Sequence, residues 1–373
     1  MTFYAIVPTL VLSNIFPLII PLLAKLTIIS TIFVILGLNV GTSKRLKSRL
    51  LGVGFTNLII GTFIVFFLMV FLIMVTAPNI PLIESLKGAT EEELSIHRES
   101  FLKGRTGWES SLGYLIESIN GAFLPFLIAY SFLINHKYKN IFALFFLLYC
   151  ISFLAKSYFL RLAIPLFFVY FSKADNKPLY ILKGGAVIAG MIFLMYSFAG
   201  SKGLEVTNDE VFFSTLYLPQ SMLEGIMWRS FVIPVMVAVD ALILFTGDLK
   251  SNFMMGDTSS FIAFIKGSER INFERMVYQS QFGGSETGNA NSYYVIEAYV
   301  NFGLTGVMLF SFMIGRIMRF LIRKENVALT AMIPMFLLNL FSTGLISLLL
   351  SGGYLAFILF LMFVKIKQPT QLE

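Results

Sequence analysis

Long apolar stretches without a single charged residue constrain the fold of this chain more than any motif does. The clearest of them cover residues 3–24, 50–76 and 327–364. An α-helix needs about 20 mainly apolar residues to cross a bilayer core that is about 30 Å thick. Only 13% of the 373 residues are charged, whereas about a quarter are charged in soluble domains. The sequence therefore predicts an all-α, polytopic membrane helical bundle.

The positive charge is concentrated in short segments between the apolar stretches. Fifteen of the 28 Lys and Arg residues lie in five such segments, at 44–49, 137–139, 173–183, 316–324 and 365–367. Cytoplasmic loops of membrane proteins carry this excess of Lys and Arg. The net charge of +7 is thus a topology signal, and we expect no binding to nucleic acid.

These segments predict a threading with about ten transmembrane helices and both termini in the cytoplasm. The expected parts are residues 1–199 with helices 1–7 and a short external loop at 77–110, residues 200–291 as a large external loop domain with short helices, and residues 292–373 with helices 8–10 and a cytoplasmic tail. Within them we expect a hairpin over 3–41 that turns near Lys25, two short spans within 140–172, a span over 292–315 and two spans within 327–364.

The apolar run 231–246 is the main competitor to this threading. If the run crossed the membrane, the four cations at 316–324 would face outside, against the positive-inside bias. The run is also short and contains Pro234 and Asp240. We therefore expect a helix at the outer surface with its apolar face toward lipid.

Four charged residues fall within or beside apolar stretches: Glu117, Lys156, Arg161 and Glu297. Charges at such positions are costly, so they face a polar cavity or pair with one another. One interpretation is structural, with Arg161 or Lys156 paired to Glu117 or Glu297. The other is a cationic cavity near the outer leaflet that binds phosphate groups, for which Arg and Lys are suited.

The large loop supplies further cations and polar groups. Arg229 follows Trp228 just before the apolar run, and Arg270 and Arg275 are five residues apart, roughly on one helical face. The loop ends in QFGGSETGNANSYYV, which is typical of a flexible flap whose amides and hydroxyls hydrogen-bond a sugar. Together these features favour an anionic ligand, although each arginine alone is typical of a solvated residue.

Several common chemistries lack their motifs in this chain. There is no GxxxxGK[ST] phosphate-binding loop, no HExxH and no cysteine cluster, and Cys150 is the single cysteine. We expect no metal and no cofactor. An enzyme built from these residues would stabilise a leaving group with arginine and lysine.

The segment YYVIEAYVNFGLTGV, which follows the flap, resembles the junction between external loop and helix in Wzy-type polysaccharide polymerases. Glu297, Tyr299, Asn301, Phe302, Gly303 and Gly306 hold the places of that motif. The segment WRSFVIPVM is similar to the arginine-then-proline segment of the same family, with Arg229 and Pro234, and AKSYFLR is similar to its basic turn. The O-antigen ligases of the same group have a histidine in the large loop, and this loop has none.

The resemblance implies a glycosyltransferase of the GT-C type in the bacterial inner membrane, with its large loop in the periplasm. Such enzymes transfer the growing glycan from undecaprenyl pyrophosphate to the non-reducing end of an incoming lipid-linked repeat unit. The partners implied are undecaprenyl-pyrophosphate-linked oligosaccharides, membrane lipids and a chain-length regulator protein. The alternatives are an O-antigen ligase-like transferase, a flippase of the same lipid-linked sugar, and a non-catalytic scaffold.

Roles follow for individual residues if the resemblance holds. Glu297 is the first candidate for the general base, followed by Asp240 and Glu224. The candidates for binding the diphosphate are Lys156, Arg161, Arg229, Arg270 and Arg275. The candidates for binding the sugar are Trp228, Tyr278, Asn289, Asn291, Tyr293 and Tyr294.

Overall fold

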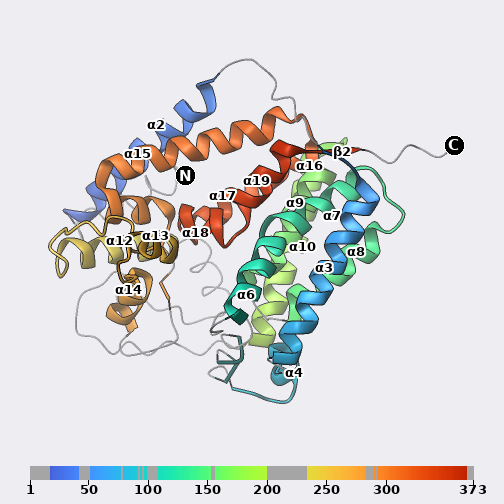
Figure 1. Cartoon of the computed structure of the whole chain (residues 1–373), viewed down its shortest axis with the longest axis horizontal. Coiled ribbons are helices and arrows are strands. Elements are labelled where there is room, and N and C mark those ends of the chain that lie inside the picture. Colours follow the sequence, from blue (N-terminus) through green and yellow to red (C-terminus); the bar gives the residue numbers. More distant parts are fainter. Residues whose placement is uncertain are drawn as a thin grey trace. The chain divides into compact units, whose positions relative to one another are not determined.

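The computed structural model of the chain describes residues 17–41, 51–76, 79–90, 93–94, 96–98, 108–152, 156–199, 233–282, 289–290 and 292–367. These residues are mostly α-helical (Figure 1). Four helical stretches are long and apolar enough to cross a membrane: Ile19–Asn39, Phe55–Thr76, Ser111–Leu133 and Tyr294–Arg323. The apolar helices indicate a membrane protein, as the sequence predicted, and the count of about ten spans stays a prediction.

The chain forms two compact units that are interleaved in sequence, and each is described by itself. Unit 1 comprises Met1–Thr42, Ser201–Phe320 and Leu337–Ser347, and unit 2 comprises Ser43–Gly200, Leu321–Phe336 and Leu348–Glu373. The predicted boundaries at 199/200 and 291/292 refer to membrane topology, which these units do not test.

Unit 1 is built around α12 (Ile233–Thr246), which contacts α2 (Ile19–Asn39) and α14 (Phe273–Phe282). Its other described elements are α13 (Ser260–Lys266), most of α15 (Tyr294–Arg323), the end of α17 (Met332–Leu340) and the start of α18 (Leu345–Leu350). The side chains of Val235–Leu242 and of Leu244 and Phe245 are all buried.

The burial of α12 corrects the prediction of a lipid-facing helix at 231–246. A helix that is apolar on all sides gains most when protein covers every side, and at 14 residues α12 is short for a span. Phe245 contacts Phe253 and Tyr299, with ring centroids 5.7 and 5.8 Å away, so the end of α12 packs against α15. Sequence periodicity could not separate burial in protein from burial in lipid.

The helix α2 corrects the predicted hairpin near Lys25. It continues from Ile19 to Asn39 without a turn, and Lys25 lies exposed on its surface. Its C-terminal half crosses α15 at Gly37 and Gly315, where a Cβ atom on either glycine would collide with the backbone of the other helix. The close approach lets Arg319 donate hydrogen bonds to the carbonyl oxygens of Leu38, in the last turn of α2, and of Gly41, just after the helix.

Unit 2 is a bundle in which successive helices lie side by side (Figure 1). Its helices are α3 (Phe55–Thr76), α4 (Pro81–Leu86), α6 (Trp108–Ser118), the π-helical segment η1 (Ile119–Phe123), α7 (Leu124–Leu133), α8 (Lys139–Ser152), α9 (Lys156–Lys173), α10 (Lys177–Ala199), α16 (Val327–Thr330) and α19 (Tyr354–Phe363). The predicted pair of short spans within 140–172 corresponds to the two helices α8 and α9, and their crossing of the membrane stays a prediction.

The C-terminal apolar stretch differs from the two spans predicted within 327–364. It forms α16, α17, α18 and α19, which are interrupted by turns at 341–344 and 351–353. Gly353 has φ 75° in the second turn, a conformation that suits glycine. A further addition to the all-α prediction is a short parallel pair of strands, β1 (Leu51–Gly54) and β2 (Val364–Lys367), in which Leu51 is opposite Val364.

Candidate functional site

The helix α15 is broken at Gly303, and this break organises the candidate site in unit 1. Gly303 has φ 62° and ψ −153°, a region that essentially only glycine occupies. The two parts of α15 then lie against each other, because a Cβ atom at Gly306 would meet the carbonyl oxygen of Ala298. The span predicted over 292–315 is therefore not one continuous helix.

The loop before α13 supplies the hydrogen bonds that the break removes from α15. The backbone N–H groups of Met254 and Met255 donate to the carbonyl oxygens of Val300 and Asn301, at 3.1 and 3.0 Å. A broken helix in a membrane needs such partners, because unpaired backbone groups are costly away from water. The loop thus stabilises the break.

The side chain of Asn301 joins the loop to the first part of α15. Its Oδ1 accepts a hydrogen bond from the backbone N–H of Gly256 at 2.9 Å. Its Nδ2 donates to Oγ1 of Thr258 at 2.7 Å and to the carbonyl oxygen of Glu297 at 2.8 Å. Asn301 is fully buried, so its three hydrogen bonds fix the turn of helix that carries Glu297.

The carboxylate of Glu297 lies against Gly344, in the turn that precedes α18. A Cβ atom at Gly344 would collide with Cδ and both carboxylate oxygens of Glu297. The backbone N–H groups of Leu345 and Ile346 face the same carboxylate, and Glu274 on α14 is near enough for its charge to act on it. The absence of a side chain at Gly344 therefore leaves the space that the carboxylate of Glu297 occupies.

Among the described residues, Oε2 of Glu297 is buried and has no hydrogen-bond partner. A buried acceptor without a donor costs about 1–3 kcal/mol, and more when it is charged. Native proteins satisfy nearly all such groups, so an exception calls for an explanation such as a catalytic role or an absent ligand. Packing alone therefore does not explain Glu297.

The two tyrosines proposed to bind sugar lie in the interior of unit 1. Tyr293 and Tyr294 are buried inside unit 1, where the hydroxyl of Tyr293 lies 2.9 Å from Oγ1 of Thr27. The hydroxyl of Tyr294 contacts Ser30 and lies 3.3 Å from Oγ of Ser311. Both rings tie α15 to α2 and are not presented to a ligand.

Asp240, the second carboxylate candidate, is fully buried in α12. Its Oδ2 accepts a hydrogen bond from Nε2 of Gln281 on α14 at 2.7 Å. A satisfied carboxylate within a packed helix pair is typical of a structural contact. Asp240 is thus better explained by the packing of α12 on α14 than by catalysis.

The two loop arginines that the structure describes do not share a helical face. Arg270 precedes α14 and is exposed, and its Nε donates to the carbonyl oxygen of Thr258 at 3.3 Å. Arg275 is half-buried in the first turn of α14, and its Nε has no hydrogen-bond partner among the described residues. Of the two, Arg275 has the unused buried donor that an anionic group would satisfy.

Arg161 in unit 2 forms the ion pair that the structural interpretation predicted. Its Nη1 lies 2.7 Å from Oε2 of Glu117, and its guanidinium lies 4.0 Å above the ring of Tyr158. One helical turn after Glu117, Nδ2 of Asn120 donates to the hydroxyl of Tyr149 at 2.6 Å, while Oδ1 of Asn120 lacks a partner among the described residues. The η1 segment turns Asn120 into the bundle.

Other predicted site residues are placed in part or lie outside the described residues. Tyr278 is half-buried on α14 and Asn289 is exposed. Lys156 begins α9, but its side chain is outside the described part, as are Glu224, Trp228, Arg229 and Asn291. The shared cationic cavity stays a prediction, because Arg161 and the loop arginines belong to different units.

Three residues of the site were missed by the analysis of the sequence: Gly344, Glu274 and Gly256. No local pattern marks them, since each matters only through a contact distant in sequence. In the part of the chain that the structure describes, no group of three or more His, Cys, Asp or Glu side chains could hold a metal ion. No family model, curated protein or solved structure matches this chain.

Proposed function

We propose that this chain polymerises lipid-linked oligosaccharide repeat units at the outer face of the bacterial inner membrane. The observation that carries the proposal is the buried Oε2 of Glu297, which has no hydrogen-bond partner among the described residues and lies in the first part of α15, before the break at Gly303. A buried carboxylate oxygen that lacks a donor calls for an explanation, and a catalytic role is one. The resemblance of its segment to Wzy-type polymerases supplies the reaction class.

In this reaction an acceptor hydroxyl attacks the anomeric carbon of the donor sugar. Glu297 takes the hydroxyl proton as the new glycosidic C–O bond forms. The bond between the anomeric carbon and the diphosphate oxygen breaks, and undecaprenyl pyrophosphate leaves with the bonding electrons. Glu297 suits this role because Asn301 and Gly344 fix its position while Oε2 stays free of a competing donor.

The departing diphosphate needs cations, and Arg275 is the first choice among the described residues. Its buried Nε has no hydrogen-bond partner among the described residues, and a phosphate oxygen would accept that hydrogen bond. Arg270, Arg229 and Lys156 remain candidates for the same role, whereas Arg161 already has Glu117 as its partner. Trp228, Tyr278, Asn289 and Asn291 remain candidates for binding sugars from the periplasmic loop.

A flippase of the same lipid-linked sugar is a second candidate because of the break at Gly303. Discontinuous helices line the substrate sites of many transporters. The chain, however, shows no internal repeat of the kind that builds those folds. A flippase also has no need of an unpaired acid next to a fixed turn.

Purified protein incubated with a lipid-linked repeat unit in detergent tests the proposal. A polymerase converts the substrate into a ladder of longer lipid-linked glycans. A flippase leaves the substrate unchanged in detergent and moves it across the bilayer of a proteoliposome. Movement of the substrate across the proteoliposome bilayer without any longer product would favour a flippase over a polymerase. Inactivity in both assays would contradict both proposals.

A further inference from the structure

The short helix α13 presents large apolar side chains to the surroundings, although it lies in the long segment 200–291 that the sequence predicts as an external loop. Phe264 is 84% exposed, Ile265 65% and Phe261 51%, while Ala263 on the opposite face is buried. Phe253 and Met255 in the preceding loop are also exposed. The five residues Phe253, Met255, Phe261, Phe264 and Ile265 are called the apolar tip.

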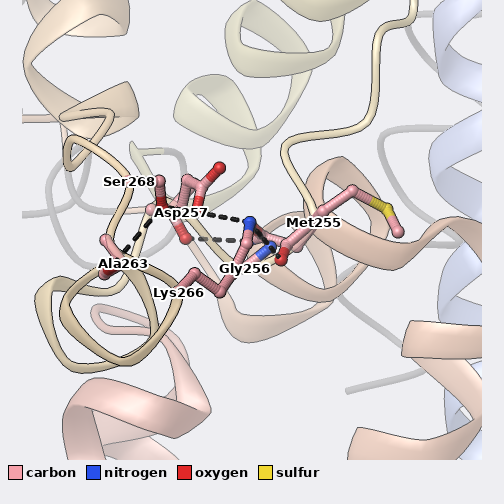
Figure 2. Close-up of polar contacts among 8 residues, drawn as sticks. Met255, Gly256, Asp257, Ala263, Lys266 and Ser268 are labelled. Carbon is pink, nitrogen blue, oxygen red and sulfur yellow. Dashed lines mark hydrogen bonds and ion pairs between the residues drawn. The ribbon is translucent and has the colours of Figure 1, made fainter.

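A polar network holds α13 in the position that keeps the apolar tip outward. Oδ1 of Asp257 accepts hydrogen bonds from Nζ of Lys266 and Oγ of Ser268, both at 2.6 Å (Figure 2). Nζ of Lys266 also donates to the carbonyl oxygen of Met255 at 3.2 Å. Gly267, with φ 68°, ends the helix in the left-handed conformation. The apolar side chains are thus exposed on a braced element.

The hydrogen bonds to α15 place the apolar tip at the level of the break at Gly303. Residues 254–256 bond to Val300 and Asn301, directly before Gly303. Residues 304–323 follow the break in α15, and at about 1.5 Å per residue these twenty residues are about 30 Å long. Arg316, Arg319 and Arg323 lie in the second half of this segment. Such cations mark the cytoplasmic end of a span, so Gly303 lies toward the outer end.

The apolar tip is continuous with the exposed apolar face of α15. Ile262 of α13 and the ring of Phe302 both lie against Gly256, and the rings of Phe302 and Phe310 are 6.1 Å apart. Leu309 and Met313, on the next turns of α15, are exposed. A path of apolar side chains therefore leads from a lipid-facing helix to α13.

We propose that α13 is a membrane-interface element whose apolar tip inserts into the lipid at the boundary of the hydrocarbon core. The occupant is lipid because the tip lies at the start of a span and continues its lipid-facing surface. The exposed charges that flank it in sequence are of both signs, Lys250 and Arg270 along with Asp248 and Glu269, so insertion does not select anionic headgroups. This placement does not depend on the chemistry proposed for Glu297.

The single cysteine allows a direct test by spin labelling. In a Cys150→Ala background, Phe264→Cys is labelled in the full chain reconstituted into phosphatidylcholine vesicles. Electron paramagnetic resonance then measures collisions of the label with molecular oxygen, which concentrates in lipid, and with a water-soluble nickel chelate. Met313→Cys serves as the lipid reference, and Glu269→Cys, exposed just after α13, serves as the water reference.

We expect the label at 264 to resemble the label at 313, with frequent oxygen collisions and few nickel collisions. Frequent nickel collisions, as at 269, would overturn the proposal because the tip would then face water. Few collisions with either reagent would also overturn it, since protein would cover the tip. If the label at 264 perturbs the fold, Ile265→Cys is labelled instead, and the same outcomes support or overturn the proposal.

Discussion

Glu117 in unit 2 and Glu297 in unit 1 are carboxylates in similar apolar surroundings, but their partners differ. Glu117 has the guanidinium of Arg161 at 2.7 Å. Glu297 has Gly344 against its carboxylate and a buried oxygen without a hydrogen-bond partner in the described part of the chain. The ion pair explains Glu117 as a link between helices, whereas the buried, unbonded oxygen of Glu297 needs a function to explain it.

The largest change in stability is expected when the ion pair between Glu117 and Arg161 in unit 2 is removed. Glu117→Gln leaves Arg161 charged and mostly buried without its partner, and breaking a buried pair costs about 3–5 kcal/mol. Thermal unfolding in detergent should show a large loss. The double variant Glu117→Gln/Arg161→Gln should recover much of it, and a double variant as unstable as the single one would contradict a structural pair.

Asn301→Ala should give the next largest effect, in unit 1. The change removes three hydrogen bonds and leaves the buried N–H of Gly256 without its acceptor, which costs about 2–3 kcal/mol. Unfolding in detergent measures the loss, and Asn39→Ala, at the exposed end of α2, is the control. Equal stability of the two variants would show that Asn301 does not hold the turn of Glu297.

Gly303→Ala tests whether the break in α15, which positions Glu297 in unit 1, requires glycine. A side chain at this φ and ψ is strained, and its Cβ atom would lie 3.2 Å from Phe253, so we expect a loss of about 1–2 kcal/mol. Gly61→Ala on α3 is the matched control, because open space surrounds that glycine. Similar stability of the two variants would mean that the break does not require glycine.

Asp257→Asn should have the smallest effect, because this ion pair is partly exposed. Hydrogen bonds from Lys266 and Ser268 lower the pKa of Asp257 below its ordinary value of 3.8. A lowered folded-state pKa stabilises the fold above pH 3.8, and this contribution is lost as the pH falls through the folded-state value. Unfolding is measured from about pH 6 to about pH 3, a range that reaches below the ordinary pKa of an aspartate. Over this range the parent should lose more stability than Asp257→Asn does.

The membrane class and several helices could be predicted from the sequence because apolar length and basic clusters are local signals. The burial of α12 could not, since an apolar run looks the same whether protein or lipid surrounds it. The break at Gly303 was also missed, although Asn301 and Gly303 stood out within the family resemblance. Its cause is the loop at 254–258, about 45 residues earlier in the chain.

For the site, the sequence pointed to Glu297, and it offered an ion pair or a phosphate-binding cavity as the place of Arg161. It could not identify Gly344 or Glu274, because they reach Glu297 only through the folding of α14 and of the 341–344 turn. It also named Tyr293 and Tyr294 as candidates for binding sugar, because they adjoin the polar end of the loop. Their hydroxyls instead find partners on α2, which no short-range pattern reveals.

Glu297→Gln, assayed with a purified lipid-linked repeat unit, tests the central claim most directly. The account predicts that the variant folds and binds the lipid-linked substrate like the parent but forms no glycan longer than the starting repeat. Glu325→Gln, at an exposed position after α15, controls for the loss of a carboxylate. A normal ladder of products from Glu297→Gln would contradict the claim that the carboxylate of Glu297 is the group that takes the acceptor proton.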